Sequence, residues 1–572
     1  MEPLSQPPSL RDRTAPWVEG GVLAILVMVV VTLGGDAVRT SYHGFLHTGL
    51  GEAVLRDGLL PENPYHAGTP LHYYTLYPAL GVLLGRFGMG PLWGFALLNI
   101  FAALLIGPAL DALGKRFGLG FVARRCAFLA MVLGFNGLGY WWAMGEEAMP
   151  SGALPLLVLL DFTRPMESLQ WDGRLQSFLP KFLNVSSYAL ALPFALFALA
   201  DNLGKARMEL LRCGALLGVT TAINPLVGGF VGLLVVAQKL PLLFLGSAGI
   251  QRLLPAATLT VVLSVPFLLP LLGGSPDGDA TLSGRFPFIG SGGWANLVGP
   301  LLLLWPLALL GIRRIPSDKL RPLGLAIGLA ALFSFLSLPW GNEYKFPRLA
   351  GILLALPAGA CLGAWWSRGF GKVVVPVLAL LCVPTTWSTI SAYAAWDTGD
   401  SRIVDHVADG RLALRESSAM VTWPPKIAAA EKKLPTDCVL VMHPGHPGVR
   451  GSGMGAQGNQ LMPILDHSLY VDSPQIHNAS LPDLQERLDE SFAFWEGRRW
   501  SAKPRQQTAP LDSQLALHSI RSRIAPRPLA VVSLRAHAPS EERLKAEDAT
   551  LVAEENGVAL WLLPGLPAVG GN

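Results

Sequence analysis

Long apolar runs recur along the first 390 residues, separated by short polar connections. A helix needs about 20 apolar residues to cross the hydrocarbon core of a bilayer. Runs that meet or approach this length lie at residues 17–35, 90–113, 120–142, 184–201, 253–272, 295–312, 321–339, 348–366 and 373–391. Residues 212–238 form a further run that Asn224-Pro225 interrupts. Proline removes a helix hydrogen bond and disfavours helical backbone before it, so two short spans fit this run better than one. The pattern predicts a polytopic α-helical membrane protein with about 11 transmembrane helices.

The pattern changes after residue 391. Short apolar runs flanked by proline or glycine predict strands at 435–443, 528–534 and 557–563. A helical period of apolar residues follows Pro482, at Leu484, Leu488, Phe492 and Trp495. Strands that alternate with helices favour a small mixed or parallel sheet. We therefore expect residues 17–391 to form a transmembrane domain and residues 392–572 a soluble α/β domain.

Composition agrees with this division. Of the 572 residues, 51% are hydrophobic and 15% are charged, and charged residues make up 37 of the last 172 but 47 of the first 400. This excludes a wholly soluble, disordered, fibrous or disulfide-scaffold protein. A net charge of +4 is too small to indicate nucleic acid as a partner. Membrane lipids are the expected surroundings.

Lysine and arginine predict the orientation, because short loops rich in these residues stay cytoplasmic. The connections expected inside are short and basic if residues 1–16 are a cytoplasmic N-terminus and 72–87 form an interfacial helix that does not span. An odd number of spans then makes the C-terminal domain extracytoplasmic. The long loops 36–89 and 143–183 would also face outward, as expected for a multi-pass protein of a bacterial inner membrane.

The first outer loop holds the densest group of candidate catalytic side chains. Acidic and histidine residues follow the first span closely: Asp36, His43, His47, Glu52, Asp57, Glu62, His66 and His72. A helix over 42–56 would place His43 and His47 one turn apart on one face. The stretch GLLPENPYHAGTPLHYY then leads into the expected interfacial helix.

In this layout the chain resembles the GT-C superfamily of multispanning membrane glycosyltransferases, which take sugar from a polyprenyl-phosphate carrier. The likeness covers the whole chain as an architecture. At the level of motifs it covers residues 36–78 and Asn342–Arg348. The resemblance implies transfer of a sugar from a polyprenyl-phosphate-linked donor to a glycan, lipid or protein acceptor on the extracytoplasmic face.

The resemblance also implies a carboxylate general base in the first outer loop and inversion at the sugar. A positioned carboxylate contributes about 10² to 10⁴ by accepting the proton of a hydroxyl nucleophile. Asp36, at the membrane boundary, is the first candidate. Because Ala37 follows it where many relatives carry a second acid, Glu52, Glu146 and Glu147 stay open as alternatives.

A departing phosphate needs cations near the outer headgroups. Lys181 precedes the fourth span, and Lys345 and Arg348 lie at the outer end of the tenth. We therefore expect these three cations, with His43 and His47, to bind substrate. Lipid headgroup contacts for the cations, and structural hydrogen bonds for the histidines, are the alternative interpretations.

No cofactor is required by the sequence. It contains neither CxxC nor HExxH, so spacing predicts no metal site, although Asp36 with a second-loop glutamate could bind a divalent ion. Two other functions compete with glycosyl transfer. A transporter or lipid flippase usually carries ionisable groups at mid-membrane depth, which are scarce here. A non-catalytic component of a polysaccharide assembly or export machine would not need the loop acids.

Overall fold

The computed structural model describes most of the chain, namely residues 9–40, 43–87, 91–151, 160–163, 169–204, 206–243, 247–272, 291–336, 338–394, 424–442, 465–471, 483–497, 499, 512–534 and 541–567. The chain divides into two compact units. The first comprises Met1–Ser41, Trp93–Pro266 and Leu282–Arg415, and the second Tyr42–Leu92, Phe267–Thr281 and Glu416–Asn572. This division differs from the boundary predicted at residue 391, because residues 42–92, which include most of the expected first outer loop, belong to the same unit as the tail.

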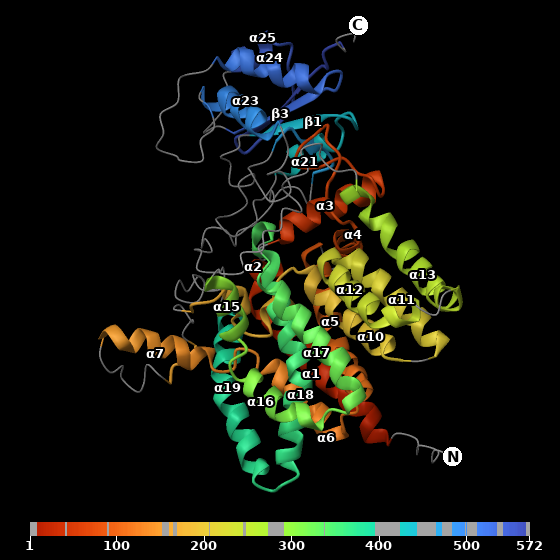
Figure 1. Ribbon diagram of the computed structural model, residues 1–572. Coiled ribbons are helices and arrows are strands. Elements are labelled where there is room, and N and C mark those ends of the chain that lie inside the picture. Colours follow the sequence, from red (N-terminus) through yellow and green to blue (C-terminus); the bar gives the residue numbers. More distant parts are fainter. Residues whose placement is uncertain are drawn as a thin grey trace. The chain divides into compact units, whose positions relative to one another are not determined.

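The first unit is helical (Figure 1). Its elements are α1 (Leu10–Leu33), α2 (Gly35–Thr40), α5 (Pro91–Arg116), α6 (Phe121–Val132), α7 (Gly139–Ser151), η1 (Gly173–Leu175), α9 (Pro180–Leu183), α10 (Ser187–Asn202), α11 (Arg207–Ile223), α12 (Pro225–Leu243), α13 (Ser247–Leu272), α15 (Ser291–Val298), α16 (Leu304–Gly311), η2 (Ile312–Arg314), α17 (Ser317–Phe333), η3 (Pro339–Tyr344), α18 (Lys345–Trp366) and α19 (Gly371–Ala394). The first two residues of α5 and the last six of α13 fall in the second unit.

Five helices among the described residues are long and apolar enough to cross a membrane: Leu10–Leu33, Trp93–Arg116, Gly249–Leu271, Asn342–Trp366 and Gly371–Ala394. Each overlaps a span expected from the sequence. The total of about 11 spans stays a prediction.

The interruption expected at Asn224 is confirmed. Helix α11 ends at Ile223 and α12 begins at Pro225, with Asn224 in extended backbone. The Asn224 side chain accepts a hydrogen bond from the Val227 amide (3.1 Å) and donates one to the Ser187 hydroxyl (2.9 Å). These bonds replace helix bonds lost at the break, and α10, α11 and α12 lie side by side (Figure 1).

Helix α18 lies at the centre of the first unit, where it packs against α6, α16, α17 and α19. Every residue from Phe346 to Gly363 is buried. Small residues allow close helix contact, because a side chain at Gly311, Gly359 or Gly363 would overlap atoms of the facing helix.

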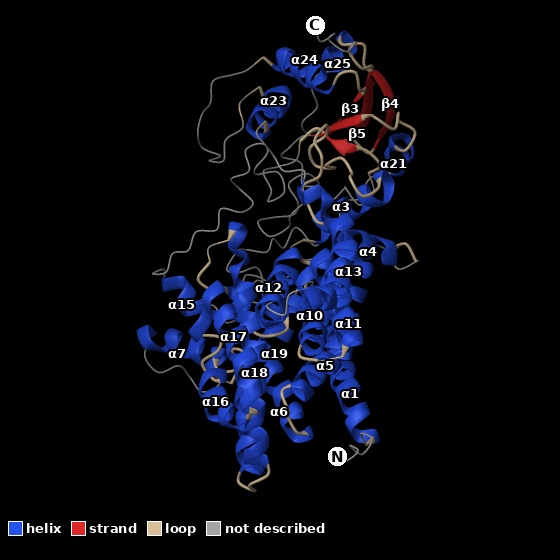
Figure 2. Cartoon of the chain, turned by 45° about the vertical axis from the view of Figure 1, so that its right-hand side comes forward, coloured by secondary structure: helices blue, strands red, loops and turns tan. Residues whose placement is uncertain are grey.

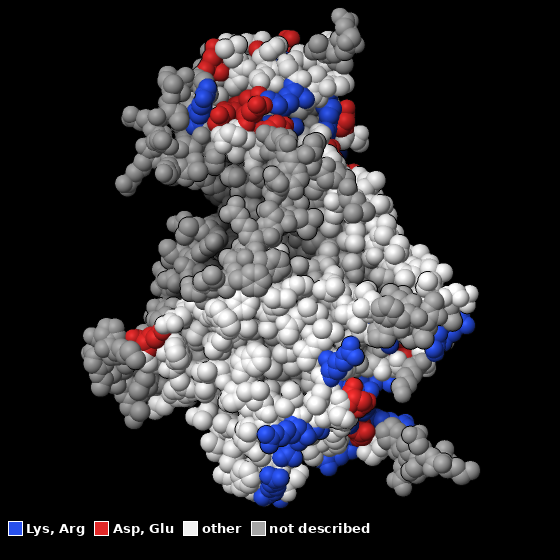
Figure 3. All heavy atoms as spheres, in the orientation of Figure 1, with Lys and Arg blue, Asp and Glu red and all other residues white. Residues whose placement is uncertain are grey.

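Buried ion pairs join α1, α5 and α6. Arg124 pairs with Asp111 (2.7 Å) and Asp12, and Arg125 pairs with Glu19 (2.8 Å) and Asp111. Exposed cations flank the ends of other helices, at Arg313, Arg314, Arg321, Arg368 and Lys372. On the face drawn in Figure 3, the lysine and arginine side chains of this unit gather toward its lower end, and the surface above them is mainly uncharged.

The second unit contains a five-stranded mixed sheet with strand order β2-β1-β3-β5-β4. Its strands are β1 (Val439–Met442), β2 (Ser468–Leu469), β3 (Leu529–Leu534), β4 (Thr550–Glu555) and β5 (Val558–Leu563). Strand β1 pairs in parallel with β2 and β3. Strand β5 pairs antiparallel with β3 and β4, and these three strands are labelled in Figure 2. The three strands expected from the sequence are confirmed. Strand β4 was not expected, because its mostly exposed TLVAEE sequence lacks a buried apolar pattern.

Alternate residues of the central strands enter two cores. Helices α23 (Leu484–Glu496) and α24 (Ser513–Ile524) cover one face of the sheet, where Val439 and Val531 point. Helices α21 (Pro425–Glu431) and α3 (Gly44–Asp57) contribute to the core on the other face, with Leu440 and Val532. The unit also contains α4 (Leu76–Gly85), which overlaps the expected interfacial helix, and α25 (Glu541–Ala546).

Residues 62–70 dock on this sheet. The Ala67 amide donates to the Leu469 carbonyl (2.8 Å), and the Leu469 amide donates to that of Pro64 (2.9 Å). The buried guanidinium of Arg487 donates to the Ala67 carbonyl (2.6 Å), and Arg527 pairs with Glu62 (2.6 Å). Part of the first outer loop is therefore an integral layer of the α/β fold.

The docked segment makes the stability of the second unit dependent on pH. Burial, together with the charge of Arg487, lowers the pKa of His66 from 6.5 to about 4, although the Asp483 carboxylate 3.3 Å away opposes the shift. As the pH falls from 6.5 to 4, the unfolded chain binds a proton that the folded chain does not. We therefore expect the free energy of unfolding to fall by about 3 kcal/mol over that range.

Chemical denaturation of the second unit, followed at several pH values in the full-length protein, measures this dependence. His66→Gln should flatten the profile between pH 6.5 and 4, whereas the exposed control His518→Gln should leave it unchanged. A profile of equal slope in wild type and His66→Gln would assign the dependence to other groups.

Candidate functional site

Three cations of the first unit surround one aromatic ring. The Tyr344 ring lies 4.3 Å from the Arg174 guanidinium carbon, 4.7 Å from Lys181 Nζ and 6.0 Å from Lys345 Nζ. Arg174 belongs to η1, Lys181 to α9 and Lys345 to the first turn of α18. A ring face partly offsets the repulsion among such cations. We call Arg174, Lys181 and Lys345 the cation cluster.

Arg348 holds the polypeptide that carries two of these cations. Its side chain is buried and donates to the carbonyls of Arg174 (2.7 Å), Ser177 (2.8 Å) and Phe178 (3.0 Å). A planar guanidinium suits this role because its donors are fixed in one fork. The segment between η1 and α9 is thereby fastened to α18.

Asp172 supplies the negative charge at the edge of the cluster. Its carboxylate accepts hydrogen bonds from the Arg174 side chain (2.5 Å) and backbone amide (2.8 Å), and Asn296 in α15 accepts one from its amide (2.8 Å). Burial raises the pKa of Asp172, but the hydrogen bonds and charge of Arg174 and the charge of Lys181 lower it more, so the pKa lies below its ordinary value. Asp172 is therefore ionised and neutralises Arg174 first.

The structure places the backbone of Asp36 in α2, which packs against α1 and α19; its side chain lies outside the description. A side chain at Gly34 would overlap the carbonyl oxygen of Tyr393, at the C-terminal end of α19. Tyr393 in turn accepts a hydrogen bond from Asn184, three residues after Lys181. Gly34, two residues before Asp36, therefore packs closely on the end of α19, where the Tyr393 hydroxyl contacts Asn184 of the segment that carries Lys181.

The second-loop acids lie in α7. Glu146 accepts hydrogen bonds from the Trp142 indole (2.8 Å) and the Gln170 amide (2.9 Å). Only the backbone of Glu147 is described. Among the described residues, the Glu146 carboxylate contacts Trp142 and Gln170 and none of the three cations of the cluster.

His43, His47 and Glu52 belong to the second unit. As expected, a helix places the two imidazoles one turn apart, with ring centroids 5.9 Å from each other. His47 is buried and packs against the rings of Tyr73 and Tyr77. Glu52 forms an ion pair with Arg86, which joins α3 to α4. These contacts are those of a packed helix pair.

Sequence reasoning missed Asp172 and Tyr344 as site residues. Asp172 lies two residues before Arg174, and Tyr344 directly precedes Lys345, so proximity in sequence was the available signal. The segments around Asp172 and Tyr344 are far apart in the sequence, and only the fold brings them together.

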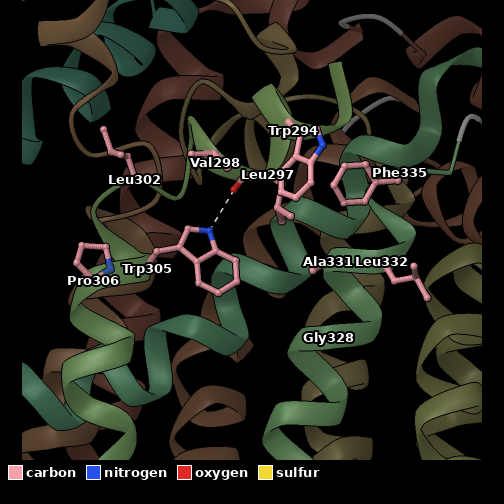
Figure 4. Close-up of a pocket in the computed structure, with 10 residues that line it drawn as sticks. All are labelled: Trp294, Leu297, Val298, Leu302, Trp305, Pro306, Gly328, Ala331, Leu332 and Phe335. Carbon is pink, nitrogen blue, oxygen red and sulfur yellow. Dashed lines mark hydrogen bonds between the residues drawn. The ribbon is translucent and has the colours of Figure 1, made fainter. Parts of the chain in front are cut away.

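An apolar groove of about 740 Å³ lies between α15, α16 and α17 (Figure 4). It is lined by Trp294 and Leu297 of α15, by Trp305 of α16, by Leu332 in the last turn of α17 and by Phe335, just beyond the end of that helix. Asn296, between Trp294 and Leu297 of α15, accepts the hydrogen bond from the Asp172 backbone amide. One short helix therefore borders both the groove and the segment that carries the cations.

Groups of three or more histidine, cysteine, aspartate or glutamate side chains able to hold a metal are absent from the described part of the chain. The Asp172 carboxylate, at the edge of the cluster, is paired with Arg174.

No protein-family model and no curated protein matches the chain. Solved structures do resemble it. The mycobacterial arabinofuranosyltransferase AftD matches with a TM-score of 0.55 and 14% identity over 96% of this chain, which spans 40% of that longer protein. ArnT from Cupriavidus metallidurans bound to undecaprenyl phosphate matches with a TM-score of 0.48 and 14% identity over 97% of this chain and 98% of that one. The Archaeoglobus fulgidus oligosaccharyltransferase matches with a TM-score of 0.40 and 11% identity over 90% and 68%. The likeness to AftD shows that this chain has the GT-C fold, as the sequence predicted.

The role of Arg348 predicts a large effect on stability. Arg348→Met leaves three buried carbonyls without their donors, and we expect a loss of about 3 kcal/mol in the free energy of unfolding. Thermal unfolding of the purified protein in detergent measures it. Arg368→Met removes an exposed arginine between α18 and α19 and should not change the unfolding temperature. Equal unfolding temperatures for the two variants would contradict the fastening role.

Proposed function

We propose that the protein is an integral-membrane glycosyltransferase that moves a sugar from a polyprenyl-phosphate-linked donor to a glycan, lipid or protein acceptor. The observation that carries this proposal is the cation cluster at the start of α18, in a chain with the GT-C fold. Its relatives in fold include an arabinofuranosyltransferase, which supports the reaction class.

The cation cluster suits a lipid-linked phosphate. Among the described residues, the ammonium of Lys345 makes no hydrogen bond or ion pair, and its nearest aromatic partner is Tyr344. A half-buried ammonium without an anion favours binding of one, since burial weakens the competition from water. We assign Lys345 and Lys181 to the donor phosphate. Arg348, whose donors engage backbone carbonyls, positions Lys181 and is not itself assigned to the phosphate.

Asp36 is the proposed general base, with inversion at the sugar. Its position in α2, in contact with α19, supports a place beside Tyr393 and the segment of Lys181. Glu146 and Glu147 remain alternatives. Glu52 is less suited to the role because its carboxylate is paired with Arg86.

The reaction is proposed for the extracytoplasmic face of a bacterial inner membrane. Basic connections join α5 to α6, α10 to α11 and α18 to α19. The other ends of these helices, namely the starts of α5, α10 and α18 and the end of α19, therefore lie away from the basic connections. Basic connections favour the cytoplasmic side. The charge pattern therefore supports an orientation with the N-terminus in the cytoplasm and with the cation cluster and the tail on the extracytoplasmic side.

The apolar groove is the proposed site for the first part of the polyprenyl chain. It is lined by tryptophan, leucine and phenylalanine, and α15 connects it to Asp172. Pockets of this size commonly hold ligands. The headgroup would then lie at the cation cluster while the lipid enters between α15 and α17.

Transfer of radiolabelled sugar from a panel of polyprenyl-phosphate-linked donors, in membranes containing matched amounts of protein, tests the function. We expect activity in wild type and a loss of about 10² to 10⁴ in Asp36→Asn, because the acceptor hydroxyl loses its base. Donor binding should survive this change. Lys345→Met should instead weaken donor binding, while the exposed control Lys372→Met should not.

Full activity in Asp36→Asn would move the base to Glu146, Glu147 or Glu52, each tested by its own glutamine variant. Absence of transfer from every donor, in a protein with a normal unfolding temperature, would contradict the proposal. A transporter, flippase or non-catalytic assembly component would then be the better interpretation.

The groove predicts a dependence on lipid length. Gly328 lines the groove and Gly324, one turn earlier in α17, does not; a side chain at either position meets no atom within 4 Å. Gly328→Leu should therefore fold normally and fill part of the groove, raising KM for long-chain donors more than for short-chain ones. Gly324→Leu is the matched control. If the two variants behave alike, the lipid does not occupy the groove.

A further inference from the structure

Three buried polar atoms near the cation cluster have no hydrogen-bond partner among the residues that the structure describes. They are the side-chain oxygens of Asn99 and Asn184 and the hydroxyl of Tyr188. Asn99 is 2% exposed and Tyr188 is 1% exposed. A buried polar atom without a partner costs free energy, and most such atoms in native proteins are matched by protein, water or ligand.

Asn99 and Asn184 are neighbours. Asn99 donates to the Asn184 carbonyl (2.7 Å), and the Asn184 side chain donates to the Tyr393 hydroxyl (3.3 Å). Because a carbonyl can only accept, the first bond fixes the amide nitrogen of Asn99, so it is the oxygen that is left without a partner. Tyr188 lies within electrostatic range of both Arg348 and Tyr344.

All of them lie at the end of the first unit that carries the cation cluster. Asn99 is in the third turn of α5, Tyr188 in the first turn of α10 and Tyr393 in the last turn of α19. Asn184 ends the short helix α9, which also carries Lys181. The unmatched atoms are thus connected to the proposed phosphate site through α9 and α18.

Their chemistry selects a neutral, hydroxyl-bearing group. Two amide oxygens can only accept hydrogen bonds, and a phenol can donate or accept. Acceptor oxygens repel a phosphate or carboxylate but match the O–H groups of a sugar. Cations for the phosphate and acceptors for hydroxyls would then lie side by side, as the two halves of a phosphosugar require.

We propose that Asn99, Asn184 and Tyr188 bind hydroxyl groups of the donor's sugar, a specificity role that rests on the proposed function. A site built to hydrogen-bond a hydroxyl discriminates strongly against a ligand that lacks it, because its buried polar groups are left unpaired. The lipid phosphate is recognised by the cation cluster and the sugar by these three residues.

Binding of two probes to the purified full-length protein tests this assignment: sugar-free polyprenyl phosphate, and a panel of the same lipid carrying pentoses or hexoses. Tyr188→Phe removes only the unmatched hydroxyl. We expect it to weaken binding of the preferred sugar-bearing lipid by about tenfold and to leave the sugar-free lipid unchanged. Its unfolding temperature should equal or exceed that of wild type, because no described protein bond is lost.

Tyr140→Phe is the matched control. Tyr140 is also a fully buried tyrosine of the first unit, but its hydroxyl donates to the Asp161 carbonyl (2.8 Å). This variant should lower the unfolding temperature and keep the ratio of the two affinities.

Unchanged binding of both probes by Tyr188→Phe would overturn the assignment, as would an equal loss for both. In either case wild-type binding of the lipids would leave the proposed function standing. Failure of the wild type to bind any probe would instead overturn the proposed function, and this inference with it.

Discussion

The buried guanidinium of Arg348 is the contact on which the candidate site depends. It binds three backbone carbonyls of residues 174–178 and so fixes that segment against the most deeply buried helix of the first unit. A buried cation is costly unless its donors are satisfied, and here polypeptide carbonyls satisfy them. The same contact therefore sets the positions of Asp172 and Arg174 and the start of the segment that carries Lys181.

Around that anchor the site separates two kinds of polar group. Arg174, Lys181 and Lys345 lie around the Tyr344 ring. The acceptor oxygens belong to Asn99 in α5 and to Asn184, whose side chain contacts Tyr393 in α19. Low local dielectric strengthens each interaction with a bound partner and raises the cost of leaving it unmade. An anionic group joined to a polyhydroxyl group satisfies both sets.

The first outer loop illustrates where prediction from sequence ended. Its acids and histidines were expected as one constellation, yet Asp36 belongs to the first unit and His43 to the second. The apolar residues Leu46, Leu50 and Tyr65 of this loop enter the core of the sheet. Arg487 and Arg527, which belong to the tail, bind residues 62–67 of the loop. Adjacent residues can join different cores because the hydrophobic effect acts on area buried, without regard to order in the chain.

The sequence by itself determined what depends on short-range physics. Apolar length identified the long helices, Pro225 ended α11 at Ile223, and the runs at 435–443, 528–534 and 557–563 became strands. Tertiary structure alone decided which distant side chains meet. Lys181 and Lys345 share the Tyr344 ring, and Asn99 reaches Asn184, because packing of α5, α9 and α18 joins segments that local propensity leaves independent. Periodicity encodes which face of an element is buried, whereas partner choice follows from the complementarity of whole surfaces.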